Sequence, residues 1–378
     1  MDFSLSSEQK LIKDGVEKFI RNEYDFETRN KIIATEDGFD RALWKQFAEL
    51  GWLGISFSEE NGGFGGGAID TNIIMEAFGS GMVVEPYLAT VVLGGNALAL
   101  GGTPSQKEEI LGSVIAGETL LAVAYAEAQS RFQLSDVATT AAKSGEQYSL
   151  NGEKVVVYGG AWADKVIVSA RTSGDQMSEA GITLFLVDAK ASGVSVTSYQ
   201  SMDGARMANI AMKNVTVGAD AIVGQLDQGY ALLDQVVDSG ISALCAEAIG
   251  EMNALFQKTL AFVKEREQFG VAIGSFQTIQ HRLVDMFMAV ESSRSMAIMN
   301  ALKLSSTDVT ERKKAVSAAK VYIGQNARHC AQEAVQLHGG IGVTEELDIG
   351  HYFRRLTLFC GAFGSTDHHL KRFADLSD

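Results

Sequence analysis

The sequence lacks the features that mark several protein classes. Its three cysteines, Cys245, Cys330 and Cys360, are far apart and odd in number. They argue against a disulfide framework and indicate a reducing compartment. No cysteine–histidine spacing typical of zinc sites occurs, so we predict no metal. No apolar run approaches the ~20 residues of a membrane span, and the first eight residues lack the basic and apolar parts of a signal peptide. We therefore expect a cytoplasmic protein without a membrane span.

Positive charge is also scarce. The 378 residues include 32 Lys+Arg against 47 Asp+Glu, a formal charge of −15. Binding to a nucleic-acid backbone needs clustered cations, and no such cluster occurs, so we expect no nucleic acid as a partner. The glycine-rich turn of a Rossmann domain and the P-loop are both missing. A hydrophobic content of 46% with 21% charged residues is typical of a globular chain of two or three domains.

Hydrophobic periodicity changes twice along the chain. The first third has helical spacing and starts with a capping box formed by Ser6 and Gln9. The middle third consists of short β-rich segments, and Asn151-Gly152 between two of them predicts a hairpin turn. From Gly229 the 3.6-residue period returns and predicts a helix of nearly 40 residues, followed by further antiparallel helices.

These patterns predict an α+β fold that is mostly α. We expect an N-terminal helical domain (1–117), a small middle β-domain (118–227) and a C-terminal four-helix-bundle domain (228–378). Only two prolines occur, which suits long helices because proline in a helix interior is strongly unfavourable.

Two clusters carry chemical information. Around the turn that follows the long helix lie Arg266, Phe269 and Gln277. A guanidinium with nearby amides suits a pyrophosphate, although a helix-ending arginine and a core phenylalanine explain the same residues. The second cluster contains Gln336 and the pair Gly339-Gly340. Paired glycines let a backbone approach a ligand closely, but they also end helices.

Together these segments resemble the acyl-CoA dehydrogenase family, and the three-part layout is similar along the whole chain. The resemblance implies an acyl-CoA substrate and an FAD held mainly by the neighbouring subunit. It also implies a homo- or hetero-oligomer (dimer or tetramer) packed through the C-terminal bundle, and an electron-transfer flavoprotein or similar acceptor. The residues implied to bind the adenine-diphosphate half of FAD are Arg266, Phe269, Gln277, Gln336, Gly339 and Gly340.

The same resemblance places four more residues around the cofactor: Ala126, Ser135, Tyr158 and Ser365. Two of these depart from the family pattern. Ala126 stands where a threonine usually hydrogen-bonds the flavin, and Tyr158 stands where another threonine is usual. The departures lie on the isoalloxazine side of the implied site.

The departure from the family pattern is larger at the position of the catalytic base. Removing an α-proton needs a carboxylate close to the substrate. The two positions where the family carries its glutamate hold Phe363 and Gly240 here. Asp238 is a weak substitute, because a helix start favours aspartate for capping alone. Glu247 is better explained by a structural hydrogen bond or salt bridge.

The residues that would bind a neighbour's FAD are intact, whereas those that would bind this chain's own flavin and supply its base are altered. This contrast indicates a subunit of a heteromeric enzyme. Within the family, the chain is most similar to the small subunit of pimeloyl-CoA dehydrogenase. Two-subunit enzymes that act on steroid side-chain thioesters are a second possibility. A non-catalytic structural or regulatory partner, and a flavin monooxygenase of the same fold, remain alternatives.

Overall fold

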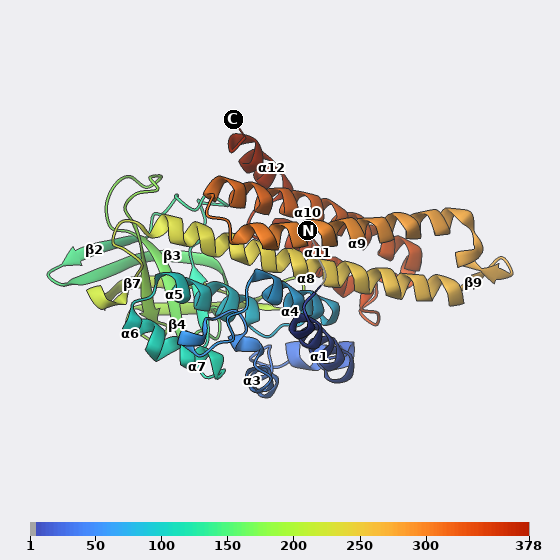
Figure 1. The fold of residues 1–378 in the computed structure, drawn as a ribbon, viewed down its shortest axis with the longest axis horizontal. Helices are drawn as coiled ribbons and strands as arrows, with labels where there is room; N and C mark the ends of the chain where they lie inside the picture. The colour runs from blue at the N-terminus through green and yellow to red at the C-terminus, as the bar shows by residue number, and fades with distance from the viewer. Residues whose placement is uncertain (1–4, 378) are drawn as a thin grey trace. The chain divides into compact units, whose positions relative to one another are not determined.

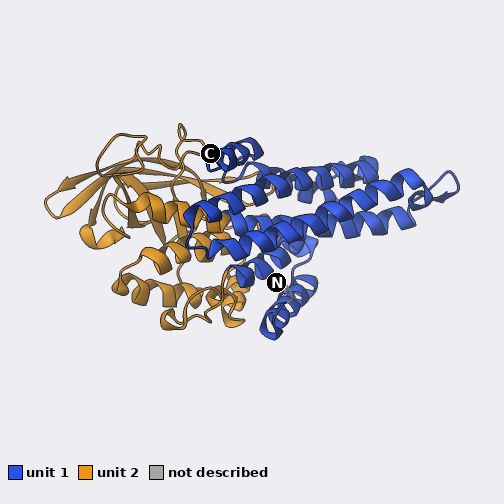
Figure 2. Ribbon diagram, turned by 45° about the horizontal axis from the view of Figure 1, so that its top comes forward, with its two compact units in different colours: residues 1–32, 68–83, 241–378 blue, residues 33–67, 84–240 orange. Residues whose placement is uncertain are grey.

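A computed structural model describes residues 5–377, drawn as a ribbon in Figure 1. The chain divides into two compact units (Figure 2). The first contains residues 1–32, 68–83 and 241–378, and the second contains residues 33–67 and 84–240. Residues 1–4, the first part of the segment in which we expect no signal peptide, lie outside the described residues.

The first unit is built from helices. They are α1 (Ser7–Glu23), most of α2 (Phe26–Ile33), α4 (Ala68–Gly81), the later part of α8 (Gly229–Glu265), α9 (Gln277–Leu304), α10 (Val309–His338), α11 (Ile349–Gly361) and α12 (Thr366–Asp375). Helix α10 packs against α9, α11 and α12, and α1 packs against α4. The 37 residues of α8 confirm the long helix predicted from periodicity, and the capping box of Ser6 and Gln9 is also confirmed.

Local chemistry explains how these helices begin and pack. Helix α10 starts at Asp308, whose carboxylate accepts two backbone N–H groups of the first turn. Helices α4 and α8 approach closely through two glycines. A Cβ on Gly79 would lie 2.0 Å from the Glu247 carbonyl oxygen, and one on Gly250 would lie 1.8 Å from that of Glu76. Any larger residue at either glycine would push the two helices apart.

The second unit contains an eight-stranded sheet. Its strands are β1 (Leu121–Ala124), β2 (Thr140–Ser144), β3 (Gln147–Tyr158), β4 (Lys165–Arg171), β5 (Ile182–Asp188), β6 (Val194–Gln200), β7 (Arg206–Gly218) and β8 (Ile222–Val223). The order is β6-β7-β3-β2-β4-β5-β8, and β1 pairs in parallel with β4. The unit also contains the short α-helices α3 (Arg41–Glu49), α5 (Asn96–Gly101), α6 (Pro104–Gln106) and α7 (Gly112–Ile115). Two π-helices (Leu88–Gly95 and Lys107–Leu111) and three 3-10 helices (Trp52–Gly54, Glu59–Asn61 and Ala219–Ala221) belong to it as well. The sheet core includes Leu150, Val168 and Phe185.

The hairpin predicted at Asn151-Gly152 is wrong. Strand β3 runs straight through both residues, and the turn that joins β2 to β3 is formed by Gly145 and Glu146. At Asn151-Gly152 the pairing with β7 shifts register instead, and the Asn151 side-chain oxygen accepts the N–H of Asn214 at 2.8 Å. The conformational freedom that suits a hairpin turn equally suits an irregular position within a long strand.

Candidate functional site

The connection between α8 and α9 forms a small hairpin of β9 (Glu267–Gln268) and β10 (Val271–Ala272) at the end of the helices (Figure 1). The two residues at its tip, Phe269 and Gly270, have φ angles of +55° and +80°. Glycine adopts this conformation freely, whereas an aromatic residue does so at an energetic cost. The Phe269 side chain is 92% exposed. The backbone therefore holds an apolar ring out in solvent.

Arg266 and Gln277 flank this hairpin, and both side chains are exposed. The Arg266 backbone donates to the Phe262 carbonyl at 2.8 Å, and its carbonyl accepts the Ile273 N–H at 2.8 Å. These bonds fix the hairpin to the end of α8 and leave the guanidinium free to face a ligand. The structure thus brings Arg266, Phe269 and Gln277 together in one exposed turn.

The second predicted cluster lies at the end of α10. Gly339 has a φ of +66°, and its N–H donates to the carbonyls of Gln336 and Val335, so it ends the helix. A Cβ built on Gly339 or Gly340 would meet no described atom within 4 Å. The glycine pair is therefore a helix cap whose outer side is also open to a ligand.

A ring contact links the two clusters. His338, in the last turn of α10, is buried and stacks on Phe262 of α8 with 4.3 Å between ring centroids. Its Nδ1 lies 2.8 Å from the Ala334 carbonyl oxygen, and burial lowers the pKa of His338, which favours the neutral ring. Since Phe262 lies one helical turn before Arg266, both clusters belong to the same end of this helical unit.

Phe363 lies in the turn between α11 and α12 with a φ of +54°. The turn is held by His369, whose Nε2 lies 3.1 Å from the Phe363 carbonyl oxygen and whose Nδ1 lies 3.3 Å from Ser317 Oγ. Burial lowers the pKa of His369 to about 3, so the ring is neutral. A carbonyl only accepts hydrogen bonds, so Nε2 carries the hydrogen and Nδ1 accepts from the serine.

Two further contacts fix the same region. Ser365 caps α12 by accepting the His368 N–H at 3.2 Å. Lys320 of α10 is buried and donates to the Phe359 carbonyl at the end of α11. Burial lowers the pKa of Lys320 to about 8. Sequence reasoning missed that Lys320 and His369 support this turn, because their partners Phe359 and Ser317 lie 39 and 52 positions away.

The residues predicted to face the flavin belong to the second unit. Ala126 follows β1, Tyr158 ends β3, and Ser135 lies in the intervening loop. Ser135 is buried: its Oγ accepts from Gln133 Nε2 at 2.9 Å, and its carbonyl accepts from Arg171 Nη2 at 2.8 Å. The Arg171 guanidinium also donates to three carbonyls of the loop between β4 and β5, those of Gln176, Ser178 and Ala180. Arg171 thus shapes the Ser135 loop, a role that sequence reasoning missed.

The second position expected for the base and the two acidic residues weighed as substitutes lie in α8. Gly240 and the fully buried Asp238 fall in its part within the second unit. Glu247 falls in the first unit, where its Oε1 accepts from Arg355 Nε at 2.9 Å. Arg355 also lies 3.5 Å from Glu251. The salt bridge predicted for Glu247 is therefore confirmed.

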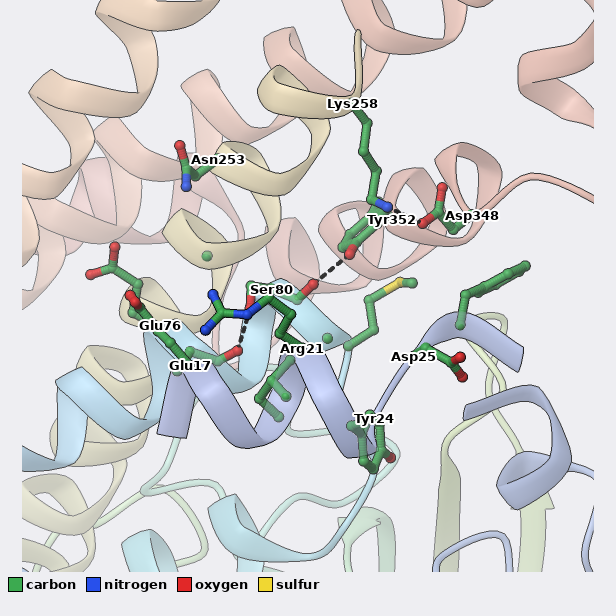
Figure 3. A pocket seen from close by; sticks show the side chains of 16 residues that line it. Glu17, Arg21, Tyr24, Asp25, Glu76, Ser80, Asn253, Lys258, Asp348 and Tyr352 are labelled. Atoms are coloured by element: carbon green, nitrogen blue, oxygen red, sulfur yellow. Dashed lines mark hydrogen bonds and ion pairs between the residues drawn. The ribbon is translucent and has the colours of Figure 1, made fainter. Parts of the chain in front are cut away.

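One cavity of about 450 Å³ lies in the first unit (Figure 3). Several of its charged groups form ion pairs within the chain. Lys258 and Asp348 form an ion pair at 2.7 Å, and Glu76 pairs with Arg294 at 3.1 Å. None of the residues predicted for the cofactor or the base lines it. We therefore assign it no part in the chemistry.

Two kinds of feature are absent from residues 5–377. No group of three or more histidine, cysteine, aspartate or glutamate side chains among them is arranged to hold a metal ion. No helix in this described part is long and apolar enough to cross a membrane.

Comparison with known proteins finds that three domains of one family match nearly the whole chain. The N-terminal domain of acyl-CoA dehydrogenases matches residues 6–118, the middle domain matches residues 122–215 and the C-terminal domain matches residues 227–375. The probable acyl-CoA dehydrogenase YngJ of Bacillus subtilis is 31% identical over 360 residues, which cover 94% of this chain and 93% of that protein.

Two solved structures are similar over the same extent. The ChsE4-ChsE5 complex of Mycobacterium tuberculosis is 26% identical with a TM-score of 0.90, and the match covers 99% of this chain and 98% of that chain. The FAD complex of PigA is 25% identical with a TM-score of 0.92 and the same coverage. The likeness therefore extends over both units.

Proposed function

Because the chain belongs to the acyl-CoA dehydrogenase family and its cofactor is FAD, we propose that it serves in the α,β-dehydrogenation of an acyl-CoA thioester as one subunit of a heteromeric enzyme. The contrast between two groups of residues carries this proposal. Arg266 and Phe269 are retained and exposed at one end of the helices. Ala126 and Phe363 replace the groups expected to bind the flavin and remove the proton.

The exposed end of the helices fits the adenine-diphosphate half of FAD by the chemistry of its groups. The Arg266 guanidinium suits the diphosphate, and the open backbone at Gly339 and Gly340 permits close approach. The Phe269 ring offers a flat apolar face to the adenine. Two amide side chains complete the set, Gln277 and Gln336. When bound, FAD supplies the acceptor for the β-hydride. Since these groups face outward, we assign them to the FAD of a neighbouring subunit.

This chain lacks a carboxylate at the positions where the family removes the α-proton of the substrate. General-base catalysis typically contributes about 10²–10⁴-fold to the rate, and neither Phe363 nor Gly240 supplies a carboxylate. Asp238 is the remaining acidic candidate in α8, but its complete burial also suits a structural role. We propose that the productive base belongs to the active site of a partner subunit.

The outer face of α9 supports assembly. Val284, Phe287 and Met288 are 55%, 49% and 60% exposed, and an apolar stripe of this kind suits burial against another subunit. We propose a dimer or tetramer packed through the C-terminal helices, with a complete dehydrogenase as the partner.

Pimeloyl-CoA is the substrate we favour, and a steroid side-chain thioester is the alternative. The proposed electron acceptor is an electron-transfer flavoprotein or a similar protein. The three-domain boundaries and the cytoplasmic location remain part of the same proposal.

Isolation of the native protein from its source tests this function. We expect a second chain to co-purify, identified by mass spectrometry, and the complex to lose its flavin absorbance when acyl-CoA is added. A colourless complex indicates the non-catalytic partner instead. Flavin that stays oxidised with every acyl-CoA, yet turns over an aromatic substrate with oxygen, indicates the monooxygenase. A homo-oligomer with full turnover would contradict the heteromeric role.

A further inference from the structure

A buried ion pair lies inside the second unit, next to Ala126. Lys154 is fully buried, Glu127 is 5% exposed, and Lys154 Nζ lies 2.6 Å from Glu127 Oε1. The lysine holds the pKa of Glu127 down to about 2, although burial alone would raise it. Taking two charges out of water is costly, and apolar residues of similar volume are often at least as stabilising. Stability alone therefore does not explain the pair.

The contacts of Lys154 fall on both sides of Ala126. Besides Glu127, Lys154 Nζ donates to the Tyr125 carbonyl at 3.3 Å and to Ser169 Oγ at 3.0 Å. Tyr125 and Glu127 are the two sequence neighbours of Ala126. One ammonium group thus holds the Tyr125 carbonyl and the Glu127 side chain, on the two sides of this residue, and ties them to β4.

Glu127 extends the same network toward the Ser135 loop. Its carboxylate accepts the N–H groups of Ala138 at 2.9 Å and Thr139 at 3.1 Å. Both residues follow the loop, whose other anchor is the Arg171 bond to the Ser135 carbonyl. The ion pair therefore holds both ends of the segment that runs from Ala126 past Ser135.

A β-bulge completes the arrangement. The pairing of β3 with β7 shifts register between Lys154 and Val157, and Val156 has a φ of +54°. The Val155 N–H points instead to the Ala126 carbonyl, at 2.9 Å. Bulges re-aim backbone groups in this way, often beside functional sites. The Ala126 N–H itself donates to no other group of residues 5–377, so it is a free donor on a fixed backbone.

We propose that Glu127 and Lys154 are positioning residues that hold the Tyr125–Ala126 backbone as a flavin-facing surface of this chain. The inference rests on the proposed function, in which Ala126 faces the flavin. The free Ala126 N–H then provides a polar contact that the alanine side chain lacks. A chain that had abandoned its own flavin contact would have no need to keep two charges buried here, so we infer that this chain still holds a flavin ring.

The double variant Glu127→Leu/Lys154→Met tests this inference because it leaves no unpaired buried charge. The matched control is Lys143→Met, at an exposed position on β2 of the same sheet. FAD affinity of the full-length chain is measured by fluorescence titration, with the visible circular dichroism of bound flavin and the thermal midpoint. We expect a lowered midpoint, because the variant also removes the acceptor of the Ala138 and Thr139 N–H groups. At temperatures well below that midpoint we expect an altered flavin spectrum and about tenfold weaker binding, equivalent to one lost hydrogen bond. The control should match the wild type.

The possible outcomes separate this inference from the proposed function. Wild-type FAD affinity and spectrum in the double variant would overturn the inference alone. A wild-type chain that binds no FAD in any assembly would overturn both. If the double variant does not fold, FAD binding by Ser169→Ala tests the inference instead, because this variant removes one hydrogen bond of Lys154 and no charge. Weaker FAD binding by about threefold then supports the positioning role, and unchanged binding overturns it.

Discussion

Replacing Arg355 by methionine tests whether Glu247 is structural. The guanidinium donates from Nε to Glu247 at 2.9 Å and from Nη2 to the Val83 carbonyl at 2.9 Å, and it lies 3.5 Å from Glu251. Glu247 and Glu251 are only 4% and 1% exposed. Methionine fills similar space without charge, so two buried carboxylates lose their cation. Breaking a buried pair in this way costs about 3–5 kcal/mol.

That cost sets the size of the expected effect. At about 2–4 °C per kcal/mol for a unit of this size, Arg355→Met should lower the midpoint of thermal unfolding by roughly 6–20 °C. Circular dichroism at 222 nm follows the helices of the first unit. The matched control is Arg354→Met, whose partner Glu345 is largely exposed, so the change should stay below about 1 kcal/mol. Equal midpoints for the two variants would refute the structural assignment of Glu247.

Three further predictions concern the cofactor, the turn at Phe363 and the assembly. Arg266→Ala removes a charge-assisted contact of roughly 1.5–3 kcal/mol, so flavin retention should fall about tenfold or more with unchanged helical circular dichroism. Full flavin occupancy in that variant would leave Arg266 as a helix-ending residue only. His369 has its pKa lowered to about 3 by burial, from an ordinary value of 6.5. The unfolded chain therefore binds more protons between these values, and the free energy of unfolding decreases as the pH falls from 6.5 toward 3. His369→Gln should flatten this dependence in urea titrations over that range, and an unchanged slope would refute the assignment. Phe287→Glu places a charge on the exposed face of α9 and should dissociate the assembly in sedimentation velocity. A wild-type monomer that retains FAD at micromolar concentration would contradict the assembly.

The sequence allowed the helices to be predicted because their signals are local. The apolar period of α8 and the cap at Ser6 depend on residues close together in the chain, and both are confirmed. The family match confirms the predicted fold class. The hairpin predicted at Asn151-Gly152 is wrong because the local backbone preference of these two residues suits both a hairpin turn and an irregular position in a strand. Only the pairing of β3 with β7 decides between the two.

The buried charges could not be predicted in the same way. Lys154 and Glu127 are 27 positions apart, and His369 reaches Ser317 across 52 positions. No local period indicates such a contact, because it depends on how distant elements pack. The exposed clusters at Arg266 and Gln336 were found from residue type and spacing, and the structure adds that Phe262 and His338 join them. Their roles toward FAD remain predictions.

Turnover by the isolated chain tests most directly whether it lacks a base of its own. The assay is acyl-CoA-dependent reduction of an artificial electron acceptor, run with short, long, dicarboxylic and steroid thioesters. We expect the wild-type chain to be slower than Phe363→Glu, because a carboxylate at this position restores part of a contribution of about 10²–10⁴-fold. Phe363→Gln is the matched control, since it has the same shape as glutamate without the basic oxygen, and it should stay as slow as the wild type. Robust turnover by the isolated wild-type chain with any of these thioesters would contradict the account.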